Sequence, residues 1–264
     1  MTKRILVIPD VHGRTFWKAP VNKYMDSVDR IVFLGDYLDP YRDEDELHTP
    51  EEIYDNLMEI IQTKQDFSEK VILLKGNHDE HYSSTTFYDL ACGTRCDIYN
   101  WKKYHDVFDK HKDCFQLAHL EEVNGIPYVF THAGLTAFWI DMVNTRLWWL
   151  DDHDISVDDQ EFINRINLLD ADQQGQEMLS VIGKHRYWLG EKTGSLLWAD
   201  IREHSIPHAP AKFALNRVVQ VFGHTRINGK REDMIEYEHL IMIDSQKCFM
   251  IDGAAPQKIT PLRE

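Results

Sequence analysis

The sequence has little cysteine, no long apolar run, and fewer basic than acidic residues. Its four cysteines include one close pair, Cys92 and Cys96, and no second pair that would complete a zinc-binding set. We therefore expect reduced thiols in a cytoplasmic protein. No apolar run approaches the roughly 20 residues of a membrane span, so no membrane segment is expected. The beginning, MTKRILVIPDVHG, lacks the extended apolar core of a signal peptide.

Basic residues are the scarcer charged class, with 29 Lys and Arg against 44 Asp and Glu and a net charge of −15. Surfaces that bind nucleic acids or anionic membranes are basic, so the charge argues against both as partners. Hydrophobic residues make up 43% and charged residues 28%, a globular composition rather than a disordered one. A chain of this length suits a single domain over residues 1–264. Histidine, the commonest metal ligand, is abundant at 14.

Short β-branched runs alternate with helical patterns, which indicates an α/β fold. The runs are almost continuously apolar, as in strands buried on both faces. They cover residues 4–9, 30–34, 70–74, 127–130, 217–222 and 239–243. A last run, 247–251, is predicted to pair with the sixth as a hairpin. Thr49 and Glu52 form a capping box before a helix, and further helices are expected over 135–150 and after a second box at 156–159. Residues 84–125 lack clear strands and are predicted to be a helical insertion.

Polar side chains follow five of the predicted strands where each strand ends. In open α/β sheets, ligands bind at the carboxyl ends of the strands, so recurrence in this one context favours a shared site. In strand order these residues are Asp10 and His12; Asp36 and Asp39; Asn77, His78 and Asp79; His132; and His224.

The donor types at these strand ends favour a transition-metal site. Carboxylate, amide and imidazole groups suit Mn, Fe or Zn better than calcium, which prefers oxygen ligands alone. The set is large enough for two divalent ions. Two ions about 3.5–4 Å apart, bridged by one carboxylate, would polarise a phosphoryl group and activate a water. Each short motif alone is weak, because an isolated strand-end Asp is more often a helix cap.

The same motifs resemble the calcineurin-like metallophosphoesterases: Asp-x-His at 10–12, Gly-Asp-x-x-Asp at 35–39 and Gly-Asn-His-Asp at 76–79. Two later motifs, His-Ala-Gly at 132–134 and Gly-His-Thr at 223–225, are similar to the phosphoprotein phosphatase branch and bacterial diadenosine tetraphosphatases. A Leu-Leu-Trp segment at residues 196–198 also resembles that branch. The resemblance implies a metallo-dependent phosphatase fold, with two mixed β-sheets packed as a sandwich and flanked by helices.

The resemblance also implies a role for each strand-end residue. Two residues bind the first ion, one bridges both ions, and three bind the second: Asp10 and His12; Asp36; and Asn77, His132 and His224. His78 would protonate the leaving-group oxygen, and Asp39 would hold its ring in place. This role agrees with general acid catalysis, which favours histidine near neutral pH.

One departure from the family pattern concerns the substrate phosphate. The family often carries an Arg directly after the second Asp of Gly-Asp-x-x-Asp, whereas this chain has Pro40 and Tyr41 there. Guanidinium groups bind phosphate through two hydrogen bonds, so we consider three other arginines as phosphate ligands. These candidates are Arg42, Arg186 and Arg202.

We therefore predict a phosphoesterase with two divalent ions, in which metal-held hydroxide attacks the phosphorus directly. The predicted substrates are phosphomonoesters, with phosphoserine or phosphothreonine in protein as one class. The alternatives are a dinucleoside polyphosphate hydrolase and a phosphodiesterase. An alternative from another class is a non-catalytic metal-binding interaction module, which is expected to have lost His78 or a bridging ligand; this chain keeps both.

Overall fold

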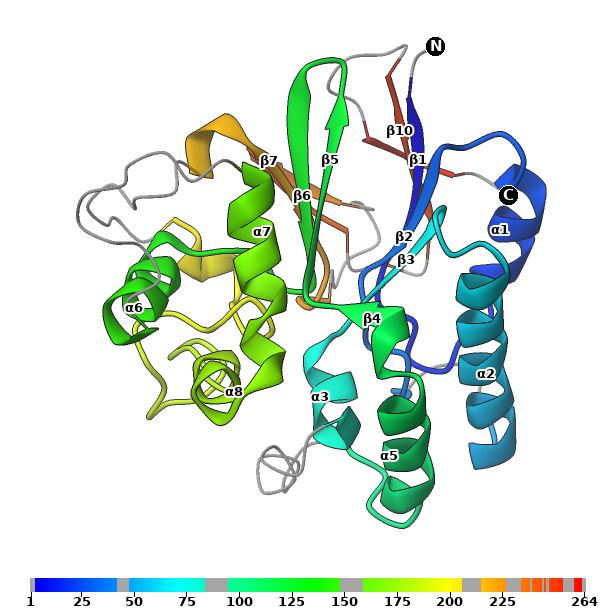
Figure 1. Cartoon of the computed structure of the whole chain (residues 1–264), viewed down its shortest axis with the longest axis horizontal. Coiled ribbons are helices and arrows are strands. Elements are labelled where there is room, and N and C mark those ends of the chain that lie inside the picture. The colour runs from blue at the N-terminus through cyan, green and yellow to red at the C-terminus, as the bar shows by residue number, and fades with distance from the viewer. Residues whose placement is uncertain are drawn as a thin grey trace. The chain divides into compact units, whose positions relative to one another are not determined.

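Two mixed β-sheets, each in its own part of the chain, form the framework of the computed structural model (Figure 1). The structure describes residues 3–41, 48–83, 95–147, 159–205, 215–226, 234–237, 239–243, 245, 247–253 and 259–262. The first unit comprises Met1–Gln116 and Ser245–Glu264, and the second unit comprises Leu117–Asp244. Each unit contains one sheet with helices, so the predicted α/β class with two mixed sheets is confirmed.

The sheet of the first unit has the strand order β11-β10-β1-β2-β3-β4. Its strands are β1 (Arg4–Ile8), β2 (Arg30–Phe33), β3 (Val71–Leu74), β4 (Phe115–Gln116), β10 (Phe249–Asp252) and β11 (Ile259–Pro261). Strands β1 to β4 are parallel, and β10 is antiparallel to both β1 and β11. Because β1, β2 and β3 are parallel, the polar residues that follow them gather at one edge of the sheet.

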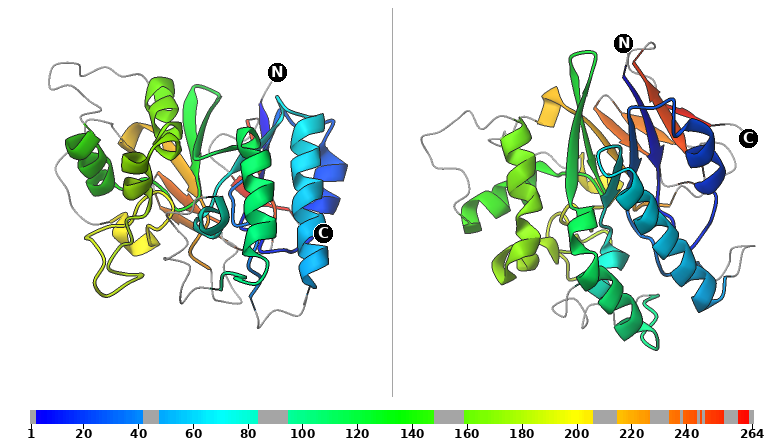
Figure 2. Two further views of the ribbon diagram at one scale, coloured as in Figure 1. Left: turned by 60° about the horizontal axis from the view of Figure 1, so that its bottom comes forward. Right: turned by 45° about the vertical axis from the view of Figure 1, so that its right-hand side comes forward.

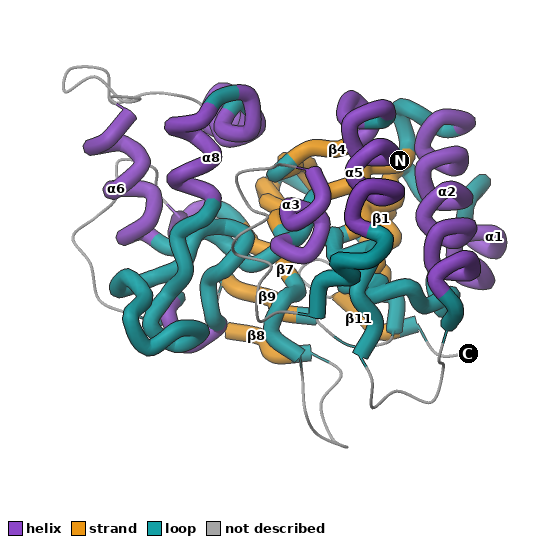
Figure 3. Tube along the Cα trace, turned by 90° about the horizontal axis from the view of Figure 1, so that it is seen from below, coloured by secondary structure: helices purple, strands orange, loops and turns teal. Residues whose placement is uncertain are grey.

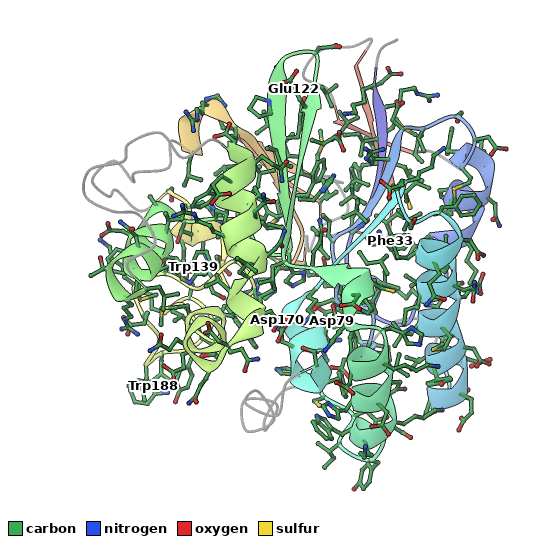
Figure 4. The ribbon with its side chains drawn as sticks, viewed as in Figure 1. Phe33, Asp79, Glu122, Trp139, Asp170 and Trp188 are labelled. Atoms are coloured by element: carbon green, nitrogen blue, oxygen red, sulfur yellow. The ribbon has the colours of Figure 1, made fainter. Side chains whose placement is uncertain are left out.

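The described residues of the first unit include the helices α1 (Lys18–Tyr24), α2 (Pro50–Asp66), α3 (Asn77–Ser83) and α5 (Trp101–Lys110). The predicted capping box begins α2, where Thr49 accepts from the Glu52 backbone and Glu52 accepts from that of Thr49. Helices α2 and α5 run side by side (Figures 2 and 3). Leu57, Phe108 and Phe33 join one apolar core, and Figure 4 labels Phe33.

The sheet of the second unit has the order β5-β6-β7-β9-β8, with β6, β7 and β9 parallel and the two outer strands antiparallel. Its strands are β5 (Ala118–Val123), β6 (Ile126–Thr131), β7 (Val219–Phe222), β8 (Ile235–Tyr237) and β9 (Leu240–Met242). Its helices are α6 (Ala137–Leu147), α7 (Asp159–Asn167) and α8 (Gln173–Leu179). The indole N–H of Trp139, labelled in Figure 4, donates to Met178 O at 2.9 Å and links α6 to α8.

The six main predicted strands are confirmed as β1, β2, β3, β6, β7 and β9. The predicted hairpin between the last two runs is wrong, because β10 pairs with β1 whereas β9 lies between β7 and β8. Both edges of β9 are already hydrogen-bonded, and β10 instead covers the edge of β1 that β2 leaves open.

The predicted insertion at residues 84–125 is helical only in part. Helix α5 lies within it, but residues 115–116 form β4 and residues 118–123 form β5. Residues 84–94 and the capping box at 156–159, apart from Asp159 at the start of α7, lie outside the described residues. The single domain over 1–264 stays a prediction. In the part of the chain that is described, no helix has the length and apolar character to cross a bilayer.

Candidate active site

The segments that follow β1 and β2 are hydrogen-bonded to each other beyond the ends of the strands. His12 N donates to Asp36 O at 2.6 Å, and Gly13 N donates to Tyr37 O at 2.8 Å. His12 and Asp36 have φ values of 46° and 53°, left-handed conformations that cost energy in residues other than glycine. The paired loops bring His12 Nε2 to 3.5 Å from Asp36 Oδ2. Such strain is typical of functional sites.

Two glycines allow the loops after β2 and β3 to approach closely. A Cβ on Gly76 would lie 2.1 Å from Asp36 Oδ1 and 2.6 Å from Asp36 N. Gly35 has φ of +104°, and a Cβ there would lie 2.5 Å from Gly76 N. Only glycine fits either position, so these residues fix the backbone on which Asp36 stands.

Asp79 holds the same two loops together, although the sequence reasoning gave it no role. Its Oδ2 accepts from Asp36 N and Gly76 N at 2.7 Å each, and its Oδ1 accepts from Tyr37 N at 2.9 Å. Figure 4 labels this fully buried residue in α3. Burial and the charge of Asp36 raise its pKa well above the usual range, against the three backbone hydrogen bonds.

Asp10, His12 and Asp36 form a buried group whose ligand atoms all lie within 4.8 Å of one another. His12 Nδ1 donates to Leu38 O at 2.9 Å, because a carbonyl oxygen can only accept. That hydrogen bond leaves the Nε2 lone pair for a metal and fixes the ring, as is common for metal-binding histidines. Burial lowers the pKa of His12 well below its usual value despite the charge of Asp36, which keeps the imidazole neutral. The donor set therefore fits a divalent ion.

Asp39 and His78 form a second buried pair beside this group. His78 Nδ1 lies 2.7 Å from Asp39 Oδ2, and Tyr82 OH donates to Asp39 Oδ1 at 2.5 Å. Burial pulls the pKa of His78 down, but the charge of Asp36 and the hydrogen bond to Asp39 outweigh it and raise this pKa. Asn77, the first residue of α3, is buried next to His78. Tyr82 was not predicted; it gives the Asp39 carboxylate a second donor.

Arg95 lies against the same pair. It donates from one guanidinium nitrogen to Asp39 O, and its Nη2 donates to His78 Nε2 at 3.3 Å. Its guanidinium carbon lies 3.5 Å from the centre of the Tyr41 ring. Because His78 Nε2 accepts from Arg95, its Nδ1 is the nitrogen that donates to Asp39. No sequence motif indicates Arg95, which precedes α5 in the segment without a clear pattern.

In the second unit, His132 and His224 come together at the ends of β6 and β7. Their Nε2 and Nδ1 atoms lie 3.1 Å apart, and both side chains are buried. The parallel pairing continues past the strands, because Gly223 N donates to His132 O at 2.8 Å. His224 has a left-handed φ of 65°. Two converging imidazole nitrogens suit a shared divalent ion.

The predicted Leu-Leu-Trp segment supports the loop that carries His132. Ala133 N donates to Leu196 O at 2.7 Å, and residues 196–198 are buried. The Trp198 and His224 rings contact each other edge to face, with centroids 6.2 Å apart. The segment therefore acts as packing beneath the histidine pair.

The three arginine candidates have different outcomes. Arg186 donates to Thr225 Oγ1 at 2.5 Å and to His224 O at 3.3 Å, so the structure brings it to the His224 loop. Arg202 instead forms two hydrogen bonds to Asp200, at 2.7 and 3.0 Å, and its side chain is 61% exposed. Its hydrogen bonds lower the pKa of Asp200, although burial opposes them. Arg42 lies outside the described residues.

Comparison with known proteins gives one family and several solved structures. The family model described as calcineurin-like phosphoesterase matches residues 3–228. A protein serine/threonine phosphatase from Saccharomyces cerevisiae has a TM-score of 0.50 and 16% identity, over 94% of this chain and 72% of that chain. A cold-active protein tyrosine phosphatase has a TM-score of 0.52 and 16% identity, over 100% of this chain and 80% of that chain. These likenesses concern the fold. No curated protein matches the chain.

Proposed function

Because this chain belongs to the calcineurin-like phosphoesterase family and is a metal-dependent phosphoric ester hydrolase, we propose that it hydrolyses phosphomonoesters. Phosphoserine and phosphothreonine in proteins are the favoured substrates. The buried Asp39–His78 pair beside the Asp10, His12 and Asp36 group carries this proposal. It combines a proton donor with metal ligands, which a binding module would not need. The proposal includes a cytoplasmic location, supported by the low cysteine content.

We assign the ligands to two divalent ions, of which Mn, Fe and Zn fit the donors best. The six ligands are Asp10 and His12 for one ion, Asp36 for both, and Asn77, His132 and His224 for the other. Support comes from the family motifs and from the local geometry within each unit. When bound, such ions supply Lewis acidity and an activated water for attack on phosphorus.

The chain's own residues supply the proton for the leaving group. His78 is held by Asp39 at Nδ1, so its Nε2 is the nitrogen that can deliver a proton to the ester oxygen. Tyr82 fixes the other oxygen of Asp39, which prevents the carboxylate from rotating away. Asp39 also stabilises the imidazolium form, because an adjacent carboxylate favours the charged ring. His78 is therefore the proposed general acid.

The test of this acid compares aryl phosphates with good and poor leaving groups in the presence of Mn. His78→Asn should lower kcat for phenyl phosphate by about 100- to 10,000-fold and lower it much less for dinitrophenyl phosphate. His111→Asn is the matched control, because His111 lies at the C-terminal end of α5 and contacts Gln65. Equal losses with both substrates would remove the acid role, and absence of any Mn-dependent turnover in the wild type would remove the enzymatic proposal.

A substrate panel then separates the substrate classes. Phosphopeptides, dinucleoside polyphosphates and a phosphodiester are assayed at one Mn concentration and compared by kcat/KM. The proposal expects the highest value with a phosphomonoester. A higher value with a dinucleoside polyphosphate or a diester would replace it with the corresponding alternative.

A further inference from the structure

We propose that Arg95 binds the non-bridging oxygens of the substrate phosphoryl group and is the residue that replaces the arginine missing after Asp39. This inference rests on the proposed function, because it names a substrate ligand of the same site. It differs from the sequence prediction, which considered only Arg42, Arg186 and Arg202.

The position of Arg95 is the first argument. Its Nη2 lies 3.3 Å from His78 Nε2, the nitrogen that faces the ester oxygen in the proposed reaction. A guanidinium at this point lies within reach of the oxygens on the same phosphorus. A charged phosphoryl oxygen is a stronger acceptor than a neutral imidazole nitrogen, so substrate can draw this N–H away from His78.

The segment that carries Arg95 is anchored, which is the second argument. Asp97 N donates to Tyr82 OH at 2.7 Å, and Trp101 Nε1 donates to His81 O at 2.6 Å. His105 Nδ1 also lies 2.7 Å from Tyr82 O. These bonds tie the start of α5 to α3, the helix that carries His78. Arg95 therefore comes from a fixed backbone close to the general acid.

Tyr41 gives the third argument. Its ring lies between two site residues, with the His12 ring centroid at 4.9 Å and the Arg95 guanidinium carbon at 3.5 Å. Stacking on an aromatic ring orients a guanidinium without using its N–H donors. The residue two positions after Asp39 thus holds an arginine from elsewhere in the chain.

Arg14 is another cation near these residues, and its guanidinium already donates to backbone carbonyl groups. Its Nε donates to Val11 O at 2.9 Å, and its Nη2 donates to Asp10 O at 2.6 Å. The Arg14 side chain is buried and shapes the loop after β1. Arg95 has one backbone bond and one bond to a ring nitrogen, so it retains donors for substrate.

The experiment measures binding of inorganic phosphate to the Mn-loaded protein by calorimetry. Arg95→Gln should weaken phosphate binding by roughly 10- to 100-fold, as expected for the loss of a charge-assisted hydrogen-bond pair. Arg95→Lys should recover part of the loss, since it keeps the charge without the planar fork. Arg165→Gln removes one positive charge on α7, paired there with Glu161, and should leave phosphate binding unchanged.

Two further measurements separate a substrate ligand from a structural residue. Mn content and thermal unfolding of Arg95→Gln should match the wild type, and its KM for an aryl phosphate should rise. Tyr41→Leu should weaken phosphate binding less than Arg95→Gln, and the double variant should be no weaker than Arg95→Gln alone. If Arg95→Gln does not fold, Arg95→Lys and Tyr41→Leu carry the test.

The outcomes distinguish this inference from the proposed function. Unchanged phosphate affinity in folded, Mn-loaded Arg95→Gln would overturn the inference, even if the wild type is an active phosphomonoesterase. A wild type that binds phosphate through Arg95 but turns over no phosphomonoester would overturn the proposed function and leave the inference standing.

Discussion

The two units hold their proposed metal ligands in different ways. In the first unit, the ligands His12 and Asp36 both stand on left-handed backbone, and the Asp79 carboxylate and two glycines fix the loops that carry Asp36. In the second unit, the ends of two parallel strands bring His132 and His224 together.

This difference teaches where each group of ligands is vulnerable. The first unit depends on strained loops, in which one added atom or one lost acceptor affects several ligands at once. The second unit depends on strand pairing and on packing of residues such as Trp198, and only one of its two proposed ligands, His224, stands on left-handed backbone. A substitution in the loops that carry Asp36 should therefore disturb several site residues at once in the first unit.

Gly76→Ala should have the largest effect. The new Cβ would lie 2.1 Å from Asp36 Oδ1, so the loop that carries this proposed metal ligand must move. We expect a loss of more than about 3 kcal/mol in the free energy of unfolding, or failure to fold, together with loss of bound Mn. Thermal unfolding and elemental analysis provide the measurements.

Gly125→Ala is the matched control in the second unit. Gly125 has φ of +78° in the turn between β5 and β6, but a Cβ there would meet nothing within 4 Å. Only the backbone conformation then opposes the substitution, at a cost of about 1–2 kcal/mol. Equal destabilisation by both alanines would contradict the close approach of the loops.

Asp79→Asn should have the next largest effect. The amide keeps one acceptor oxygen and places an NH₂ donor against backbone N–H groups that now donate to Asp79. An unsatisfied buried donor costs about 1–3 kcal/mol, and loss of an outer support lowers metal affinity by about 10- to 100-fold. Urea unfolding and Mn titration measure the two effects separately.

Asp172→Asn is the corresponding change in the second unit. Asp172 caps α8 by accepting from Gly175 N at 2.8 Å, a role that Asn performs about equally well. The variant should unfold at nearly the wild-type urea concentration. If Asp79→Asn and Asp172→Asn lower the free energy of unfolding by similar amounts, Asp79 acts as an ordinary helix cap and not as a support for two loops.

His204 should make stability depend on pH. Its Nε2 donates to Ala133 O at 3.0 Å, and burial lowers its pKa from 6.5 to about 4. The unfolded chain therefore takes up a proton near pH 6.5 while the folded chain does not. The contribution of His204 to the free energy of unfolding should be fully present above pH 6.5 and should be lost as the pH falls from 6.5 to about 4. We expect this loss to be about 2 kcal/mol for this partly buried ring.

Unfolding is measured with urea at pH 7.5 and pH 5 without added metal. His204→Phe keeps an aromatic ring to stack on Phe222 and removes the titrating group, so it should show a smaller loss at low pH. An identical loss in the variant and the wild type would assign the pH dependence to other groups.

Thr49→Ala should have the smallest effect. Thr49 Oγ1 accepts from Glu52 N at 3.2 Å at the start of α2, and loss of such a cap costs about 1 kcal/mol. Asp172→Ala, which removes the cap of α8, should cost a similar amount, because caps act locally in both units. Thermal unfolding checks the pair, with Thr49→Ser as the control. A markedly larger loss for one cap would show that the units differ beyond their site loops.

The proposed metal ligands could be named from the sequence because each belongs to a short local motif. Each follows a short apolar run, and parallel strands bring such positions to one edge whatever lies between them. The Asp39–His78 pair was predicted from its motifs, and the structure brings the two side chains to 2.7 Å.

The features that were missed depend on contacts between distant segments. Arg95 reaches His78 only because Asp97 and Trp101 bind α3, and no periodic pattern reports such bonds. Arg186 and Arg202 both contact the Asp200 carboxylate. Which of the two also reaches the His224 loop depends on side-chain directions that the sequence does not indicate. The hairpin error arose because adjacent runs usually pair, whereas here they belong to different sheets.

The strand order of the first sheet has a consequence for synthesis on the ribosome. Strand β1 is made first, but its antiparallel neighbour β10 emerges more than two hundred residues later. Residues 117–244 form one continuous segment, whereas the first sheet keeps an open edge on β1 until β10 has been made. A chain that stops before β10 should aggregate through that edge, because an unpaired strand edge can pair with another chain.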